Sequence, residues 1–117
     1  MRAAVIEADG VLAVREIPEP EIGDYDALVD MLYGATCTGT DLALIAGTLP
    51  FRAALPTVLG HESVGRVAAV GPKVRHLRPG DLVTRVGTPP AAGYTISWGG
   101  FAERGIAKDF RAMDEDG

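Results

Sequence analysis

The sequence predicts a mainly β protein: a compact β-barrel or sandwich with one short helix and long loops. It contains 15 glycines and 8 prolines among 117 residues, and this density of turn formers favours short strands joined by many turns. The stretches between the turns are short and suited to strands. They do not alternate with full-length helices, so a doubly wound nucleotide-binding fold is excluded for this chain.

The first half of the chain predicts three strands. Residues 1–8 and 11–16 form a hairpin, because Asp9-Gly10 between them is a strong two-residue turn signal. Residues 18–23 hold two prolines and a glycine and predict a rigid connector. Residues 27–33 then predict the third strand, whose imperfect alternation leaves its register open.

A short helix is expected over Leu42–Ala46. Thr40 or Asp41 can cap its first turn, and Gly47 suits a left-handed helix end. Residues 50–56 predict a loop.

The second half predicts three more strands, at residues 64–70, 82–86 and 101–106. A surface loop is expected between the last two, around Pro89, Pro90 and Gly93.

Composition excludes several classes of function. The net charge is −5, and residues 1–30 carry eight acids against two bases, which disfavours binding to nucleic acid. No apolar run is long enough to span a bilayer, so no membrane partner is expected. The single cysteine, Cys37, forbids an internal disulfide and fits a reducing compartment, so the protein is expected to be cytoplasmic.

Cys37, His61 and Glu62 are the candidate chemical residues. A thiolate, an imidazole and a carboxylate form a donor set for a catalytic zinc that keeps one position open. Zinc lowers the pKa of a bound alcohol or water and polarises a carbonyl. From the residues alone two alternatives stay open: a cysteine that packs as a small apolar side chain, and a His-Glu pair that only satisfies its own hydrogen bonds.

Ordered blocks along residues 1–113 carry a family resemblance. They are Met1-Arg2-Ala3-Ala4-Val5, Pro18-Glu19-Pro20, Cys37-Thr38-Gly39-Thr40-Asp41, Leu59-Gly60-His61-Glu62-Ser63-Val64-Gly65, Val67-Ala68-Ala69-Val70-Gly71, Arg78-Pro79-Gly80-Asp81-Leu82-Val83 and Gly99-Gly100-Phe101-Ala102-Glu103. With these blocks the chain resembles the N-terminal, GroES-like domain of zinc-containing medium-chain alcohol and polyol dehydrogenases. The resemblance implies a GroES-like β-barrel.

The resemblance also implies a role for each matched residue. Cys37 and His61 correspond to the first two protein ligands of the catalytic zinc. Glu62 corresponds to the acid beside them, which either supports the ligands from outside or exchanges onto the metal. Thr40 corresponds to the hydroxyl that passes the substrate proton toward solvent, and Asp41 to the acid that orients a ligand.

Two departures from the family pattern bear on the metal. The usual Cys-Gly-Thr/Ser-Asp run has one extra residue here, so alignment from Gly39 would put Thr38 in the ligand position. Alignment from the preceding strand keeps Cys37 there and leaves Thr38 as a rival relay residue. Residues 84–98 contain no cysteine, so a second, structural zinc is excluded.

The resemblance further implies what lies outside this chain. Residues 1–113 are expected to be the GroES-like domain, and residues 114–117 an acidic tail leading to an absent nucleotide-binding domain. That domain would supply NAD or NADP, and the third zinc ligand also lies beyond the matched residues. The parent enzyme is expected to be a homo-oligomer that acts on a small alcohol, polyol or sugar, and this chain alone to be inactive.

Removing a partner domain is expected to uncover an apolar seam through which the chain could self-associate. The candidate seam residues are Phe51, Leu55, Tyr94, Ile96 and Trp98.

Two other functions remain open at this point. One is a non-enzymatic GroES-like barrel, since the blocks at residues 67–71 and 79–83 also resemble the co-chaperonin. The other is a zinc-free quinone or enoyl reductase domain of the same superfamily. Members of that group usually lack the cysteine and the histidine, so Cys37 and His61 favour the zinc branch.

Overall fold

The computed structural model describes residues 1–51, 53–84 and 93–117, and these residues form a mainly β protein with two helices. The strands are β1 (Arg2–Ala8), β2 (Val11–Glu16), β3 (Asp26–Gly34), β4 (Thr57–Val58), β5 (Ser63–Val70), β6 (Leu82–Thr84), β7 (Thr95–Ile96) and β8 (Arg104–Lys108). The helices are α1 (Thr38–Ala46) and α2 (Phe110–Asp116). The mainly β fold class is confirmed, while the expectation of a single helix is corrected to two.

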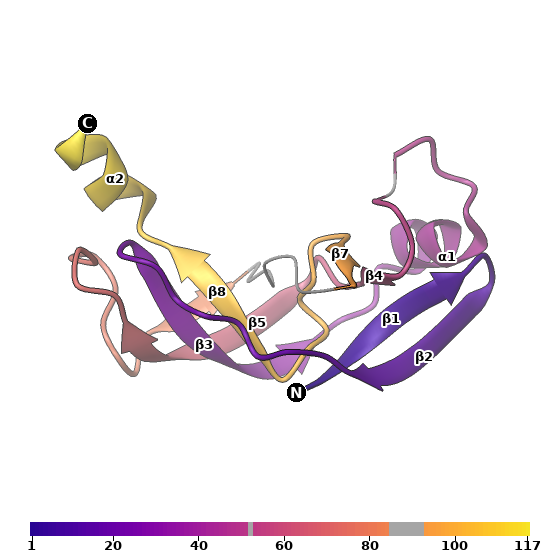
Figure 1. Cartoon of the computed structure of the whole chain (residues 1–117), viewed down its shortest axis with the longest axis horizontal. Coiled ribbons are helices and arrows are strands. Elements are labelled where there is room, and N and C mark those ends of the chain that lie inside the picture. The colour runs from indigo at the N-terminus through magenta and orange to yellow at the C-terminus, as the bar shows by residue number, and fades with distance from the viewer. Residues whose placement is uncertain (52, 85–92) are drawn as a thin grey trace.

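The strands form two four-stranded sheets (Figure 1) rather than one closed cylinder. The first has the order β2-β1-β4-β7 and the second β6-β5-β3-β8. An isolated bridge between Ala3 and Ala102 and a hydrogen bond from Ala4 N to Phe101 O (2.8 Å) join the sheets where β1 approaches the start of β8.

The first sheet is built on the predicted hairpin. β1 and β2 pair antiparallel from Arg2 opposite Glu16 to Ala8 opposite Val11, and Gly10 in the turn has a φ of 77°. This left-handed value explains why glycine suits the turn. One core cluster is formed by residues of this sheet together with Ile17, and its members are Ala3, Val5, Ile17 and Val58.

The second sheet brings distant segments together. β3 lies between β5 and β8 and pairs antiparallel with both. Its buried face contributes Ala27 and Val29 to a second core cluster with Val67 of β5. The last strand, expected over 101–106, instead occupies 104–108, because Phe101 and Ala102 belong to the crossing between the two sheets.

Helix α1 begins earlier than the sequence indicated. Its N-cap residue is Cys37, so Thr40 and Asp41 lie inside the helix instead of capping it. Asp41 still completes the helix start, since its Oδ2 accepts the N–H of Cys37 at 2.9 Å. The predicted end is confirmed: Gly47 adopts the left-handed conformation with a φ of 76°.

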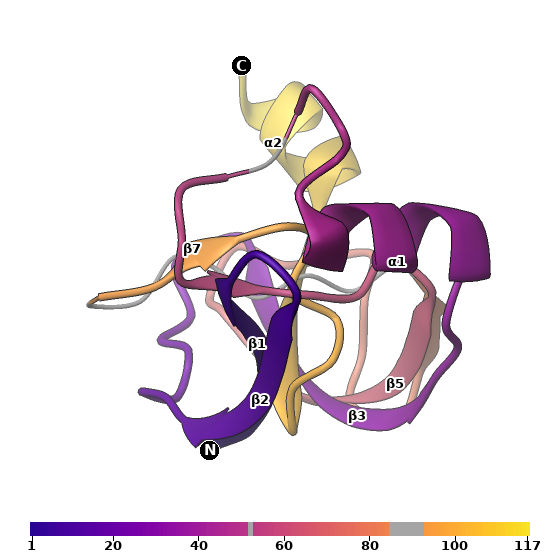
Figure 2. The same ribbon diagram turned by 90° about the vertical axis from the view of Figure 1, so that its right-hand side faces the viewer.

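Helix α1 packs on the core through Leu44, which is 1% exposed. Leu44 forms a third core cluster with Ile6 and Leu59, and Phe101 packs against this cluster from the side. Figure 2 shows α1 beside the turn of the β1–β2 hairpin, where the N–H of Gly10 donates to the carbonyl oxygen of Ile45 at 2.7 Å. The third cluster includes Leu59, two residues before His61, and so supports the segment that carries this candidate residue.

Helix α2 contains residues 114–116, which the sequence analysis placed in an acidic tail. The N-cap residue Asp109 is buried and accepts three backbone N–H groups: Ala112 (2.9 Å), Arg75 (2.7 Å) and His76 (2.8 Å). Burial works in the opposite direction, but these three donors lower the pKa of Asp109 to about 2.

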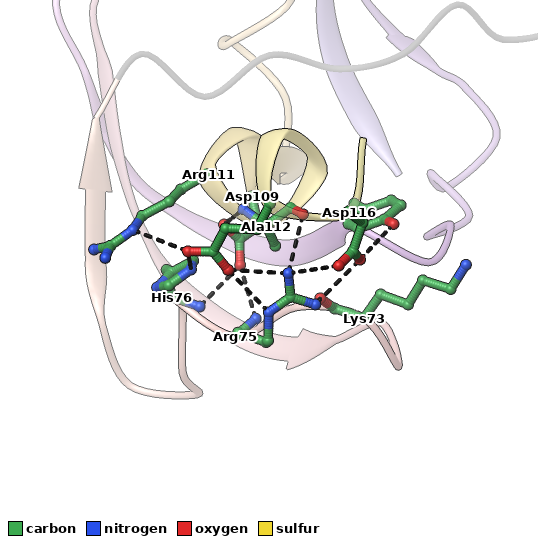
Figure 3. A network of polar contacts seen from close by, with 9 residues as sticks. Lys73, Arg75, His76, Asp109, Arg111, Ala112 and Asp116 are labelled. Atoms are coloured by element: carbon green, nitrogen blue, oxygen red, sulfur yellow. Dashed lines mark hydrogen bonds and ion pairs between the residues drawn. The ribbon is translucent and has the colours of Figure 1, made fainter.

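The far end of α2 is held by Arg75, as Figure 3 shows. Its guanidinium donates to Glu115 and Asp116 at 3.0 Å each and to the carbonyl oxygen of Ala112 at 3.0 Å. Tyr25 donates its hydroxyl to the other oxygen of Asp116 at 2.7 Å. These contacts attach α2 to the turn that follows β5.

Part of the sequence prediction lies outside the described residues, namely Pro89, Pro90 and the end of the strand expected over 82–86. Among the residues that the structure describes, no helix is both long and apolar enough to cross a membrane.

Candidate metal centre

Strand pairing brings the candidate residues together although they are far apart in sequence. At the end of β3, Gly34 lies opposite Ser63, the first residue of β5. The N–H of Ala35 continues this pairing and donates to the carbonyl oxygen of Glu62 at 2.9 Å. Because Cys37 follows β3 and His61 precedes β5, both residues lie at the same end of the paired strands β3 and β5.

The donor atoms of Cys37, His61 and Glu62 all lie within 4.8 Å of one another. Cys37 and His61 are half-buried and Glu62 is exposed, so the cluster opens to solvent on its carboxylate side. Sulfur, imidazole nitrogen and carboxylate oxygen are the ligand types that zinc binds in proteins. The arrangement can therefore supply up to three protein ligands to one metal ion.

Asp41 approaches the cluster from the first turn of α1. Its Oδ1 lies 3.4 Å from Nδ1 of His61, and the two side chains are only 3% and 12% exposed. Neither of these two buried atoms has a hydrogen-bond partner in the described part of the chain. Since Nδ1 is buried against a carboxylate, Nε2 is the ring nitrogen that His61 can offer to a ligand.

Thr40 and Thr38, the two candidate relay residues, differ in how exposed they are. The hydroxyl of Thr40 lies 3.6 Å from the sulfur of Cys37 and is half-buried. Thr38 is exposed in the first turn of α1, whereas the donor group contains Cys37.

The indole of Trp98 packs against His61, with the ring centres 5.2 Å apart and the planes tilted by 50°. The sequence did not predict this contact, because Trp98 is 37 positions after His61 in the chain. The backbone of Trp98 is in the left-handed region, with a φ of 68°. Trp98 also lines a cavity of about 440 Å³ beside the cluster. The other residues lining it are Leu44, Pro50, Phe51, Ala53, Ile96 and Ser97.

The expected apolar seam is only partly exposed. Phe51 and Trp98 are 57% and 44% exposed, and both lie at the cavity beside His61. Tyr94 and Ile96 pack against the first core cluster, and Leu55 packs against the third. Of the five candidate seam residues, Phe51 and Trp98 are therefore the two whose side chains are exposed, and both line the cavity beside His61.

A profile of the family described as the alcohol dehydrogenase GroES-like domain matches residues 23–114. The chain belongs to this family, and the resemblance noted in the sequence is confirmed.

Several relatives are dehydrogenases. The chain is 40% identical over 83 residues to a "Probable zinc-binding alcohol dehydrogenase" of Mycobacterium tuberculosis, an alignment that covers 71% of this chain and 21% of the relative. It is 41% identical over 90 residues to an alcohol dehydrogenase of Geobacillus stearothermophilus, covering 76% of this chain and 26% of the relative.

A solved structure agrees with these relatives. The alcohol dehydrogenase TADH from Thermus sp. ATN1 superposes with a TM-score of 0.70 at 33% identity, over 92% of this chain and 37% of that one. The chain thus spans about a quarter of the length of its curated relatives. It is related to part of a medium-chain alcohol dehydrogenase.

Proposed function

We propose that this chain is the metal-binding catalytic domain of a zinc-dependent, NAD(P)-linked alcohol or polyol dehydrogenase. The observation that carries the proposal is the gathering of the Cys37, His61 and Glu62 donor atoms within 4.8 Å of one another. A relative named as a probable zinc-binding alcohol dehydrogenase supports it.

The residues present fit a zinc ion. Cys37 supplies a soft sulfur, His61 an imidazole nitrogen and Glu62 a carboxylate oxygen, and Asp41 faces the ring nitrogen of His61 that the metal would not use. When bound, zinc supplies Lewis-acid polarisation of an alcohol or carbonyl oxygen. We expect one such site and no structural zinc, because the sequence has only one cysteine.

The remaining side chains have separate tasks in this proposal. The hydroxyl of Thr40, next to Cys37, accepts the proton of the substrate alcohol and passes it toward solvent. We expect the cavity beside Trp98 and His61 to hold the carbon skeleton of the substrate, because Leu44, Phe51 and Ile96 give it apolar contacts.

Hydride transfer needs parts of the enzyme that this chain does not supply. We expect NAD or NADP to bind through the nucleotide-binding domain of the parent protein, which we propose is a cytoplasmic homo-oligomer. The chain alone is accordingly expected to bind zinc but to leave the absorbance of NADH unchanged when alcohol and NAD are added.

A zinc titration with matched variants tests the proposal. We expect one equivalent of zinc to bind, and Cys37→Ser and His61→Ala each to weaken binding strongly. Thr38→Ala, next to Cys37 in an exposed position, serves as the control and should bind zinc as the unaltered chain does. Zinc binding that is lost in Thr38→Ala but kept in Cys37→Ser would contradict the ligand assignment. Absence of zinc binding by the unaltered chain would contradict the proposal that Cys37, His61 and Glu62 hold the metal in this chain.

A further inference from the structure

The aromatic ring of Phe101 contacts both segments that carry the candidate metal ligands. It faces Gly34, three residues before Cys37, and Gly60, directly before His61. Neither glycine leaves room for a side chain. A Cβ atom at Gly34 would lie 2.6 Å from Cε1 of Phe101, and one at Gly60 would lie 2.5 Å from its Cδ1.

The backbone around Phe101 is attached to the same region. Its N–H donates to the carbonyl oxygen of Leu59 at 2.9 Å, and the N–H of Gly100 donates to that of Gly60 at 2.8 Å. The carbonyl oxygen of Phe101 accepts the N–H of Ala4 in β1 at 2.8 Å. The ring is therefore fixed relative to the first sheet as well as to the segment before His61.

Beyond the strand pairing, a backbone hydrogen bond from Ala35 N–H to Glu62 O at 2.9 Å joins the two segments that carry the candidate ligands. A hydrogen bond at the end of a strand pair opens easily, because strand ends fray. Phe101 lies against the glycines on either side of this bond, so its ring can limit how far the segments separate or approach.

We propose that Phe101 is a positioning residue for the metal centre: its ring, seated between Gly34 and Gly60, sets the separation between Cys37 and His61. This inference rests on the proposed zinc site for its functional meaning. Its structural part, that Phe101 holds the two segments in register, stands independently of any metal.

The variant Phe101→Leu tests the proposal, because leucine keeps the apolar contact with the third core cluster but lacks the flat ring that reaches both glycines. We expect its zinc affinity to fall by about tenfold, the low end of the range for residues that support metal ligands. We expect the hydrogen exchange of the Ala35 amide to accelerate relative to that of Val67. The Val67 amide, bonded to Asp81 O at 2.9 Å in the second sheet, is the internal reference.

Gly34→Ala provides a size-exchange test. The new methyl group collides with the Phe101 ring, so Gly34→Ala alone should also weaken zinc binding. In the double variant with Phe101→Leu, the collision is relieved, and the effect of Gly34→Ala should be smaller than in the parent chain. Gly34 is preferred to Gly60 for this test, because Gly60 has a φ of 117° and any side chain there is strained regardless of Phe101.

Ile17→Ala is the matched control, since Ile17 is 4% exposed in the first core cluster, away from the metal centre. It should lower stability without changing zinc affinity or the exchange ratio of Ala35 to Val67. If Phe101→Leu behaves like Ile17→Ala, Phe101 is only a core residue and the proposal is overturned. If the ratio rises while no variant, nor the parent chain, binds zinc, the positioning role is supported and the proposed metal site is the part that fails.

Discussion

Asp41→Asn changes one atom that faces the candidate metal centre. The asparagine carbonyl oxygen can still accept the N–H of Cys37, which the carboxylate accepts at 2.9 Å. The NH₂ group then faces Nδ1 of His61, now 3.4 Å from Oδ1. Because an NH₂ group only donates, it favours the tautomer with the proton on Nε2, and that nitrogen then has no lone pair for a metal.

The size of the effect follows from the burial of this contact. Altering a residue that supports a metal ligand typically costs about 10- to 100-fold in metal affinity, which corresponds to about 1.4–2.7 kcal/mol. Asp41 is 2% exposed, so water cannot enter to accept a proton from Nδ1 in its place. We therefore expect a loss in the upper half of this range.

Competition between the protein and a coloured chelator for Zn²⁺ measures this loss. Leu42→Ala, at the next position of α1 with a 59% exposed side chain, is the control and should bind zinc like the parent chain. Circular dichroism checks that both variants are folded. A folded Asp41→Asn variant with undiminished zinc affinity would show that Asp41 does not set the state of His61, and would refute this reasoning.

Three further predictions concern stability and association. Leu44→Ala should lower the free energy of unfolding by about 3 kcal/mol in urea titrations, because Leu44 is 1% exposed, whereas Leu42→Ala should change it little; equal losses would contradict the third core cluster. The lowered pKa of Asp109 means that its carboxylate stabilises the fold above about pH 4 and ceases to do so as the pH falls toward 2; Asp109→Asn should flatten this part of the acid-unfolding profile, and an unchanged profile would refute the assignment. The chain should self-associate through the exposed Phe51 and Trp98, so its sedimentation coefficient should rise with protein concentration. Replacing both residues by serine should reduce this rise, and a parent chain that stays monomeric would rule the prediction out.

The sequence predicted the turns and helix ends that depend on the conformation of a single residue. The Asp9-Gly10 turn joins two strands in the structure, and Gly47 ends α1 in the left-handed conformation, because both positions demand a backbone that glycine adopts freely. Helix α2 was not predicted, because it is only seven residues long and depends on contacts with Arg75, 34 positions before its N-cap residue Asp109.

The residues of the candidate site could be predicted from the sequence, but their proximity in the fold could not. The residue types and the family resemblance singled out Cys37, His61 and Glu62, and their roles as ligands remain a proposal. Their proximity depends on the pairing of Gly34 with Ser63, a non-local register that no local pattern encodes. The sequence also did not predict the contact of Trp98 with His61 or that of Phe101 with Gly34 and Gly60. Both contacts join residues that are far apart in the chain.

X-ray absorption at the zinc edge of the zinc-loaded chain tests the central claim most directly, since it reports the elements bonded to the metal. With Cys37 and His61 as ligands, the spectrum should contain one sulfur at about 2.3 Å together with nitrogen and oxygen at about 2.0–2.2 Å. The sulfur contribution should vanish in Cys37→Ser. A spectrum of the parent chain with nitrogen and oxygen neighbours alone, unchanged by Cys37→Ser, would contradict the proposed metal centre.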